Sequence, residues 1–159
     1  MTTLTNEQFA ALKAAVLAES SLANAIANGI DWQVADWCNA TSTFVVWKTS
    51  VSLDTIMKSD TFDWTRVDNL TVGKARIWDW LFNSGSINPS RTNVRTGIDS
   101  TWVGTAADLA VRASVYAECK RFATNAEKVL ATGIGSNATP GTMSFEGSID
   151  INTAGLFKL

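Results

Sequence analysis

An apolar stripe towards the C-terminal end is the sequence feature that most constrains the fold of this 159-residue chain. Apolar side chains recur there at intervals of seven residues: Leu109, Tyr116, Ala123 and Leu130. Side chains at this spacing share one face of an α-helix. Thr105, with Asp108 three residues later, is a suitable N-terminal cap. We therefore predict one long helix over residues 105–131, lying at the centre of a helical bundle.

Shorter helices are predicted in the preceding part of the chain. Thr5 and Gln8 form a capping box for the first helix. Residues 43–49 are β-branched and aromatic, which favours an extended segment. The first predicted helix ends before residue 20. Further short helices are predicted over residues 22–28, 53–58, 71–82 and 89–102. The predicted fold class is therefore mainly α.

The C-terminal residues 132–159 are rich in Gly and Thr and poor in charge. Residues 133–141 have the composition of a flexible linker. Apolar and polar residues then alternate from Met143 to Ile151, which is typical of a strand. An isolated strand is marginal by itself, but it can add to a sheet edge of another chain. We therefore divide the chain into a helical body, residues 1–131, and an extended β-like C-terminal docking arm, residues 132–159.

The chain contains no histidine, and its two cysteines, Cys38 and Cys119, lie far apart in the sequence. Ser–His–Asp and Cys–His catalytic arrangements need a histidine, and zinc sites need clustered Cys or His ligands. We accordingly expect no enzymatic activity, no catalytic residue, no metal and no cofactor. A pair of carboxylates that hydrolyses a glycoside remains an alternative. The candidate acids are Glu7, Glu19, Asp31, Asp36 and Asp79.

Charge and hydropathy restrict the expected partners and location. The net charge of −2 provides no basic field for nucleic acid, so we expect no sequence-specific binding to it. The first residues lack the features of a signal peptide, and no apolar run approaches ~18 residues. We expect synthesis in the cytoplasm, free thiols and no membrane contact.

Six of the seven tryptophans precede residue 81. Large aromatic side chains can fill a small core, and a few of them can be left for an interface. They can also form a platform on which a ligand stacks. We expect the first arrangement, and a ligand-binding module stays an open alternative.

Three stretches of sequence carry a resemblance to a known family. They are residues 42–51 (STFVVWKTSV), residues 87–98 (INPSRTNVRTGI) and residues 120–133 (KRFATNAEKVLATG) continuing to residues 142–147 (TMSFEG). Together with residues 4–19, they resemble a family of small proteins encoded by tailed bacteriophages and prophages. Small helical phage proteins with an extended C-terminal arm resemble head–tail connector, or neck adaptor, proteins.

The resemblance implies a virion structural protein at the head–tail junction. It implies a homo-oligomeric ring that contacts the phage portal and the tail or nozzle proteins. The expected partner-binding residues lie in the arm: Met143, Phe145, Ile149, Ile151, Leu156 and Phe157. On this hypothesis, a chain without residues 133–159 should remain folded. The alternatives are a capsid cement or tail-completion protein and a virion-associated cell-wall hydrolase.

Overall fold

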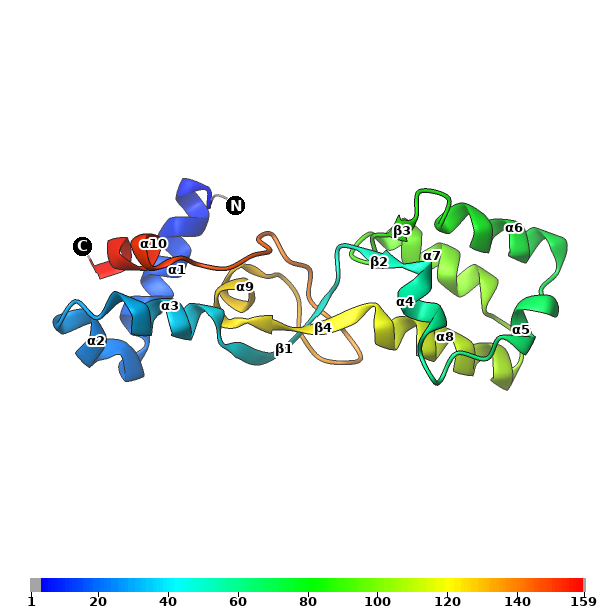
Figure 1. The fold of residues 1–159 in the computed structure, drawn as a ribbon, viewed down its shortest axis with the longest axis horizontal. Helices are drawn as coiled ribbons and strands as arrows, with labels where there is room; N and C mark the ends of the chain where they lie inside the picture. Colours follow the sequence, from blue (N-terminus) through cyan, green and yellow to red (C-terminus); the bar gives the residue numbers. More distant parts are fainter. Residues whose placement is uncertain (1–3, 159) are drawn as a thin grey trace. The chain divides into compact units, whose positions relative to one another are not determined.

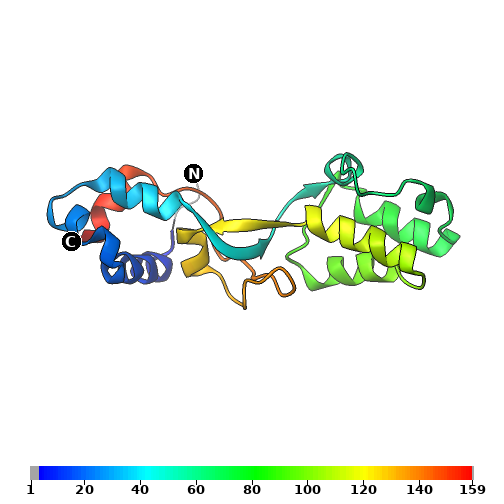
Figure 2. The ribbon, with the colours of Figure 1, turned by 90° about the horizontal axis from the view of Figure 1, so that it is seen from below.

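The computed structural model describes residues 4–158, of which 56% are helical and 12% are in strands. It forms two compact units. Unit 1 comprises residues 1–46 and 122–159, and unit 2 comprises residues 47–121. The first and last parts of the chain therefore belong to the same unit, as the blue and red segments of Figures 1 and 2 show. The boundary predicted at residue 131 falls inside unit 1.

Unit 1 is a group of short helices around one core. Thr5 caps the first helix through the predicted capping box, in which the Gln8 side chain also accepts a hydrogen bond from the Thr5 backbone. Buried side chains from both ends of the chain, such as Leu12, Val16 and Phe157, meet in that core. Its helical elements are α1 (Asn6–Ala18), η1 (Ser20–Leu22), α2 (Ala23–Ala27), α3 (Asp31–Asn39), α9 (Asn125–Leu130), α10 (Ile151–Gly155) and η2 (Leu156–Lys158).

Unit 2 has a separate core that is strongly aromatic. Trp78, Trp102 and Phe62 are buried there, and the rings of Trp78 and Trp102 lie edge to face with centroids 5.3 Å apart. Strands β2 and β3 pair antiparallel, which places Val51 opposite Ile87. The elements are β2 (Val51–Ser52), α4 (Leu53–Met57), α5 (Thr65–Asp68), α6 (Val72–Leu81), β3 (Ser86–Ile87), α7 (Thr92–Thr101) and α8 (Ala106–Glu118).

The chain passes from one unit to the other in extended conformation. Strand β1 (Thr41–Trp47) pairs with β4 (Lys120–Thr124) in a two-stranded sheet. The structure thus confirms the predicted extended segment, and its partner strand comes from a distant part of the sequence. β1 also forms an isolated parallel bridge from Val46 to Gly141.

The predicted long helix over residues 105–131 is wrong. Helix α8 ends at Glu118, β4 follows, and a new helix, α9, begins at Asn125. Thr124 has extended backbone angles and caps α9 in a capping box with Glu127. The backbone between the two helices is bound by β1 and its neighbours: the Ser42 hydroxyl donates to the Ala123 carbonyl at 2.8 Å. Strand pairing and a second cap therefore override the helical periodicity.

The predicted extended C-terminal arm is also wrong, because the tail packs on its own chain. The side chains of Phe145, Ile149 and Phe157 are at most 4% exposed in the core of unit 1. Residues 151–155 form helix α10, whose N-terminus is capped by the Asp150 side chain. Helix α10 packs on α3, as Figure 1 shows. Burial of these apolar side chains makes the tail part of the folded unit.

Hydrogen bonds fix this tail to earlier residues. The Asn39 amide donates to the Ile149 carbonyl and accepts from the Ile149 N–H, both at 2.8 Å. The Gln8 amide donates to the Ser144 carbonyl at 2.9 Å, and Lys158 pairs with Asp31 at 2.6 Å. These bonds satisfy backbone groups of Ser144 and Ile149 within the chain itself.

Candidate interaction site

The six residues predicted to bind a partner have different environments. Phe145, Ile149 and Phe157 are core residues of unit 1, and Met143 is partly buried. Ile151 and Leu156 are 56% and 51% exposed. Phe145, Ile149 and Phe157 therefore pack within the chain, whereas Ile151 and Leu156 are accessible on the surface of unit 1.

The candidate carboxylates are divided between the two units, and Asp36 lies with Asp31 in α3 of unit 1. Asp31 is in an ion pair with Lys158. Hydrogen bonds from the Ser21 hydroxyl and backbone lower the pKa of Glu19, whereas a general acid needs a raised pKa. Glu7 lies in the first turn of α1, and Asp79 belongs to α6 of the other unit.

Both cysteines are free and buried, Cys38 in unit 1 and Cys119 in unit 2. Burial raises the pKa of each thiol to about 12. The thiols are therefore neutral at physiological pH and pack as apolar side chains.

The tryptophans are divided between core and surface. Trp78 and Trp102 are buried in unit 2, whereas Trp64 and Trp80 are 50% and 70% exposed on the same unit. Trp32 is 54% exposed on unit 1. The expectation that most tryptophans fill the core therefore holds only in part, and unit 2 presents aromatic surface to its surroundings.

One face of α6 carries much of this exposed surface. Val72, Arg76 and Trp80 follow each other at intervals of four residues, so they share one side of the helix. All three are exposed, and Val72 reaches 76%. The buried Trp78 faces the core from the other side. No described residue of the chain covers this outer face of α6.

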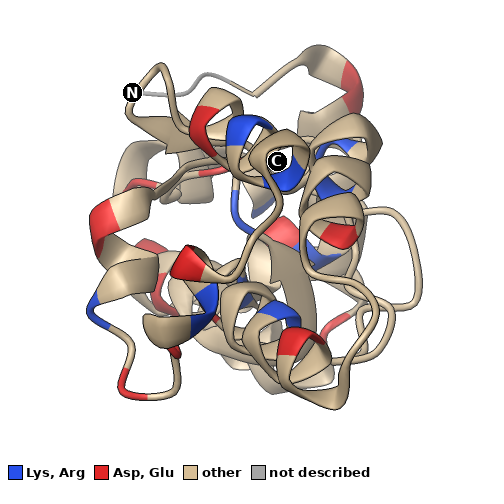
Figure 3. Cartoon of the chain, turned by 90° about the vertical axis from the view of Figure 1, so that its right-hand side faces the viewer, with Lys and Arg blue, Asp and Glu red and all other residues tan. Residues whose placement is uncertain are grey.

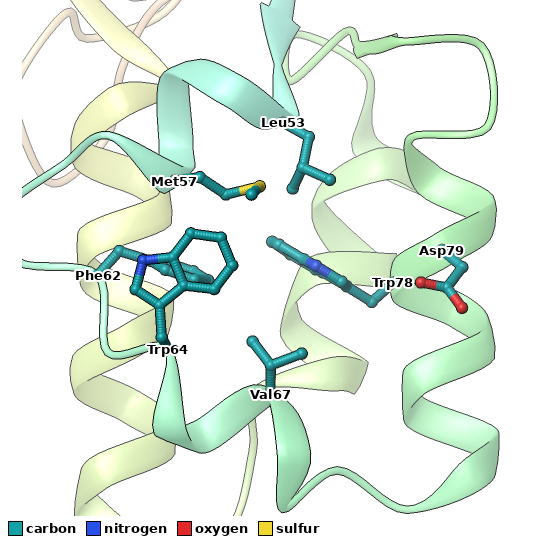
Figure 4. A pocket seen from close by; sticks show the side chains of 7 residues that line it. All are labelled: Leu53, Met57, Phe62, Trp64, Val67, Trp78 and Asp79. Atoms are coloured by element: carbon teal, nitrogen blue, oxygen red, sulfur yellow. The ribbon is translucent and has the colours of Figure 1, made fainter.

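Unit 2 also has an apolar pocket of about 160 Å³, to which α6 contributes Trp78 and Asp79. Figure 4 shows Trp64 and Trp78 across from each other, with Met57 and Leu53 on one side and Val67 on the other. Helices α4, α5 and α6 and the segment between α4 and α5 supply the walls. The lining residues are Leu53, Met57, Phe62, Trp64, Val67, Trp78 and Asp79.

The aromatic rings of the pocket are held in fixed mutual orientations. Phe62 lies edge to face with Trp64, at 5.5 Å between centroids and 87° between planes. Phe62 is nearly parallel to Trp78, at 6.3 Å and 16°. The planes of the two indoles are therefore steeply inclined to each other. The abundance of tryptophan left such a surface open as an alternative to core packing. Nothing in the sequence indicated Leu53 or Met57, which lie one turn apart on α4.

Both positively and negatively charged residues occur along the helices and loops that Figure 3 shows. Within residues 4–158 no single helix has the length and hydropathy to cross a membrane. The bent helix pair Asn6–Ala18 and Ser20–Asn28, with 78° between its members, meets both criteria when taken together.

Comparison of this chain with protein-family models, curated proteins and solved structures finds no match.

Proposed function

We propose that this chain is a structural subunit of a tailed-phage particle and forms a homo-oligomeric ring at the head–tail junction. In this role it connects the portal with the tail or nozzle proteins. The phage setting is supported by the resemblance of residues 42–51, 87–98 and 120–133. The resemblance to connector proteins included an extended C-terminal arm, which residues 132–158 do not form, so the choice of the head–tail junction rests on the small, mainly helical character of the chain.

The exposed aromatic surface of unit 2 is the observation that carries an assembly role. Trp64 and Trp80 leave large apolar areas in water. Tryptophan is enriched at the centres of protein interfaces and contributes a large share of their binding free energy. Burial of these side chains against another subunit would remove that apolar area from water.

This proposal assigns the contacts to a different segment from the one expected on sequence grounds. The side chains of Phe145, Ile149 and Phe157 stabilise unit 1 itself, because they are buried in its core. The outer face of α6 and the pocket of unit 2 take that role. Ile151 and Leu156 provide a second, smaller apolar surface on unit 1.

Incorporation into particles tests this assignment. Trp80→Ala should strongly reduce the amount of the chain in purified virions of the phage that encodes it, measured by quantitative mass spectrometry. Trp32→Ala is the matched control, because it removes an indole of unit 1 that is also more than half exposed, at 54% against 70% for Trp80. The control variant should be incorporated at the wild-type level.

Copy number separates the ring from its structural alternatives. A fixed, small number of copies for each portal assembly supports the connector role, whereas hundreds of copies for each particle identify a capsid cement protein. Complete absence of the wild-type chain from purified virions would contradict the proposal.

A further inference from the structure

The pocket of unit 2 has walls that suit a cation as well as an apolar group. The faces of aromatic rings carry negative electrostatic potential and attract ammonium and guanidinium groups within about 6 Å. Trp64 and Trp78 supply two steeply inclined indoles, and Trp64 is half exposed, so its ring is open to a ligand from outside. Tryptophan is the most favourable of the aromatic side chains for this interaction.

Asp79 is the one charged residue among those that line the pocket. Its side chain forms no ion pair and no hydrogen bond with any other residue in the described part of the chain. Figure 4 places it at the margin of the pocket beside Trp78. An uncompensated carboxylate at the rim of an apolar site favours a positively charged ligand.

The remaining walls fit the stem of a long side chain. Leu53, Met57 and Val67 are aliphatic or thioether residues, against which methylene groups pack favourably. A volume of about 160 Å³ is comparable with the cavity of about 150 Å³ that accommodates benzene in another protein. The pocket therefore takes one side chain rather than a folded segment.

We propose that this pocket binds the side chain of a lysine or arginine on a partner protein of the assembly. The methylene stem lies against Leu53, Met57 and Val67, and the cationic end lies against the indoles of Trp64 and Trp78 with Asp79 nearby. This inference rests on the assembly role proposed above and names the chemistry of the partner's contact. A quaternary ammonium headgroup would satisfy the rings but would leave the aliphatic walls unused.

Titrations of the full chain, monitored through the indole N–H signals of Trp64 and Trp78 by NMR, test this inference. The ligands are N-acetyl-lysine methylamide and N-acetyl-arginine methylamide. N-acetyl-norleucine methylamide is the neutral control with a similar stem, and choline represents a headgroup without a side-chain stem. We expect at least one of the two cationic amides to bind roughly ten-fold more tightly than the neutral amide.

Two substitutions locate the binding site. Asp79→Asn should weaken binding of the cationic amides several-fold and leave the neutral amide unaffected. Asp60→Asn is the matched control, since it removes an exposed aspartate of unit 2 that does not line the pocket. Trp64→Ala should abolish binding, and its far-ultraviolet circular dichroism must equal that of the wild-type chain.

Equal binding of the neutral and cationic amides would overturn the inference, because the pocket would then recognise apolar shape alone. Tighter binding of choline, or the absence of any shift at saturating ligand, would also overturn it. A negative titration would not change the result expected in the virion assay, because that assay tests the outer face of α6 through Trp80. Conversely, if the chain is absent from virions and the titration is still positive, the pocket binds a cation but not for particle assembly.

Discussion

At the scale of single residues, Asp108 shows how one side chain links two segments of unit 2. It is 7% exposed and accepts a 2.6 Å hydrogen bond from the Arg66 guanidinium. It also accepts from the Thr105 backbone at the start of α8, where the Thr105 hydroxyl binds the Asp108 N–H in return. The Arg66 hydrogen bond and then those from Thr105 lower the pKa of Asp108 to about 2.

Asp108→Asn should therefore destabilise unit 2 in a pH-dependent manner. The pKa in the folded chain is about 2 and the ordinary value is 3.8. Because the folded pKa is depressed, the stabilisation by the carboxylate is complete above the ordinary value and is lost as pH falls towards 2. Urea unfolding should show the variant clearly less stable at pH 7, with a difference that shrinks below pH 4. A difference that is independent of pH would contradict this role of the charge.

At the scale of elements, the sequence predicted the start of a helix correctly where one local signal was present and no other signal conflicted with it. The caps at Thr5 and Thr105 start α1 and α8 as the sequence indicates. Between residues 118 and 125 the heptad spacing of apolar residues suggested a continuous helix. The capping box of Thr124 and Glu127, itself legible in the sequence, indicated the break instead. Pairing of β4 with β1 could not be read locally, because its partner lies about eighty residues away.

Thr124→Ala tests whether the cap determines this break. The variant loses the hydroxyl that accepts from the Glu127 N–H at 3.2 Å. We expect a loss of about 1 kcal/mol in the free energy of unfolding, the usual effect of removing a threonine cap. Thr124→Ser keeps a capping oxygen and should stay close to wild type in the same urea titration. Equal stability of Thr124→Ala and wild type would show that strand pairing alone ends α8.

The tail illustrates a second limit of local sequence reasoning. Alternation of apolar and polar residues from Met143 to Ile151 indicated a strand that pairs with another chain. Its partners are instead in the chain itself, where Asn39 binds both backbone groups of Ile149. Only the tertiary packing shows that Phe145 and Phe157 complete the core of unit 1.

The candidate site was accessible to sequence reasoning only through its aromatic residues. The number of tryptophans indicated either core or surface, and the structure shows both uses. Trp64 and Trp78 line one pocket because both rings pack against Phe62. Spacing in the sequence gives no information on this convergence, since it depends on helices folding against each other.

At the scale of the whole molecule, the C-terminal residues should be essential for the stability of unit 1. Phe157 is fully buried, and its ring lies 5.1 Å from that of Phe9. Phe157→Ala should lower the free energy of unfolding by about 3–5 kcal/mol. Leu156→Ala, at the neighbouring exposed position, should change it by less than about 0.5 kcal/mol.

Deletion of residues 133–159 extends the same argument. The truncated chain should lose the folded unit 1, as judged by hydrogen exchange of α1 and α3. A truncated chain with native protection of these helices would show that the tail is dispensable for folding and would contradict its assignment to the core of unit 1.

Light scattering of the purified chain, alone and mixed with a candidate portal protein, tests the proposed connector role most directly. The proposed connector role predicts a stoichiometric, ring-sized complex with the portal that Trp80→Ala weakens and Trp32→Ala leaves unchanged. A chain that keeps the same mass with and without the portal would contradict that role.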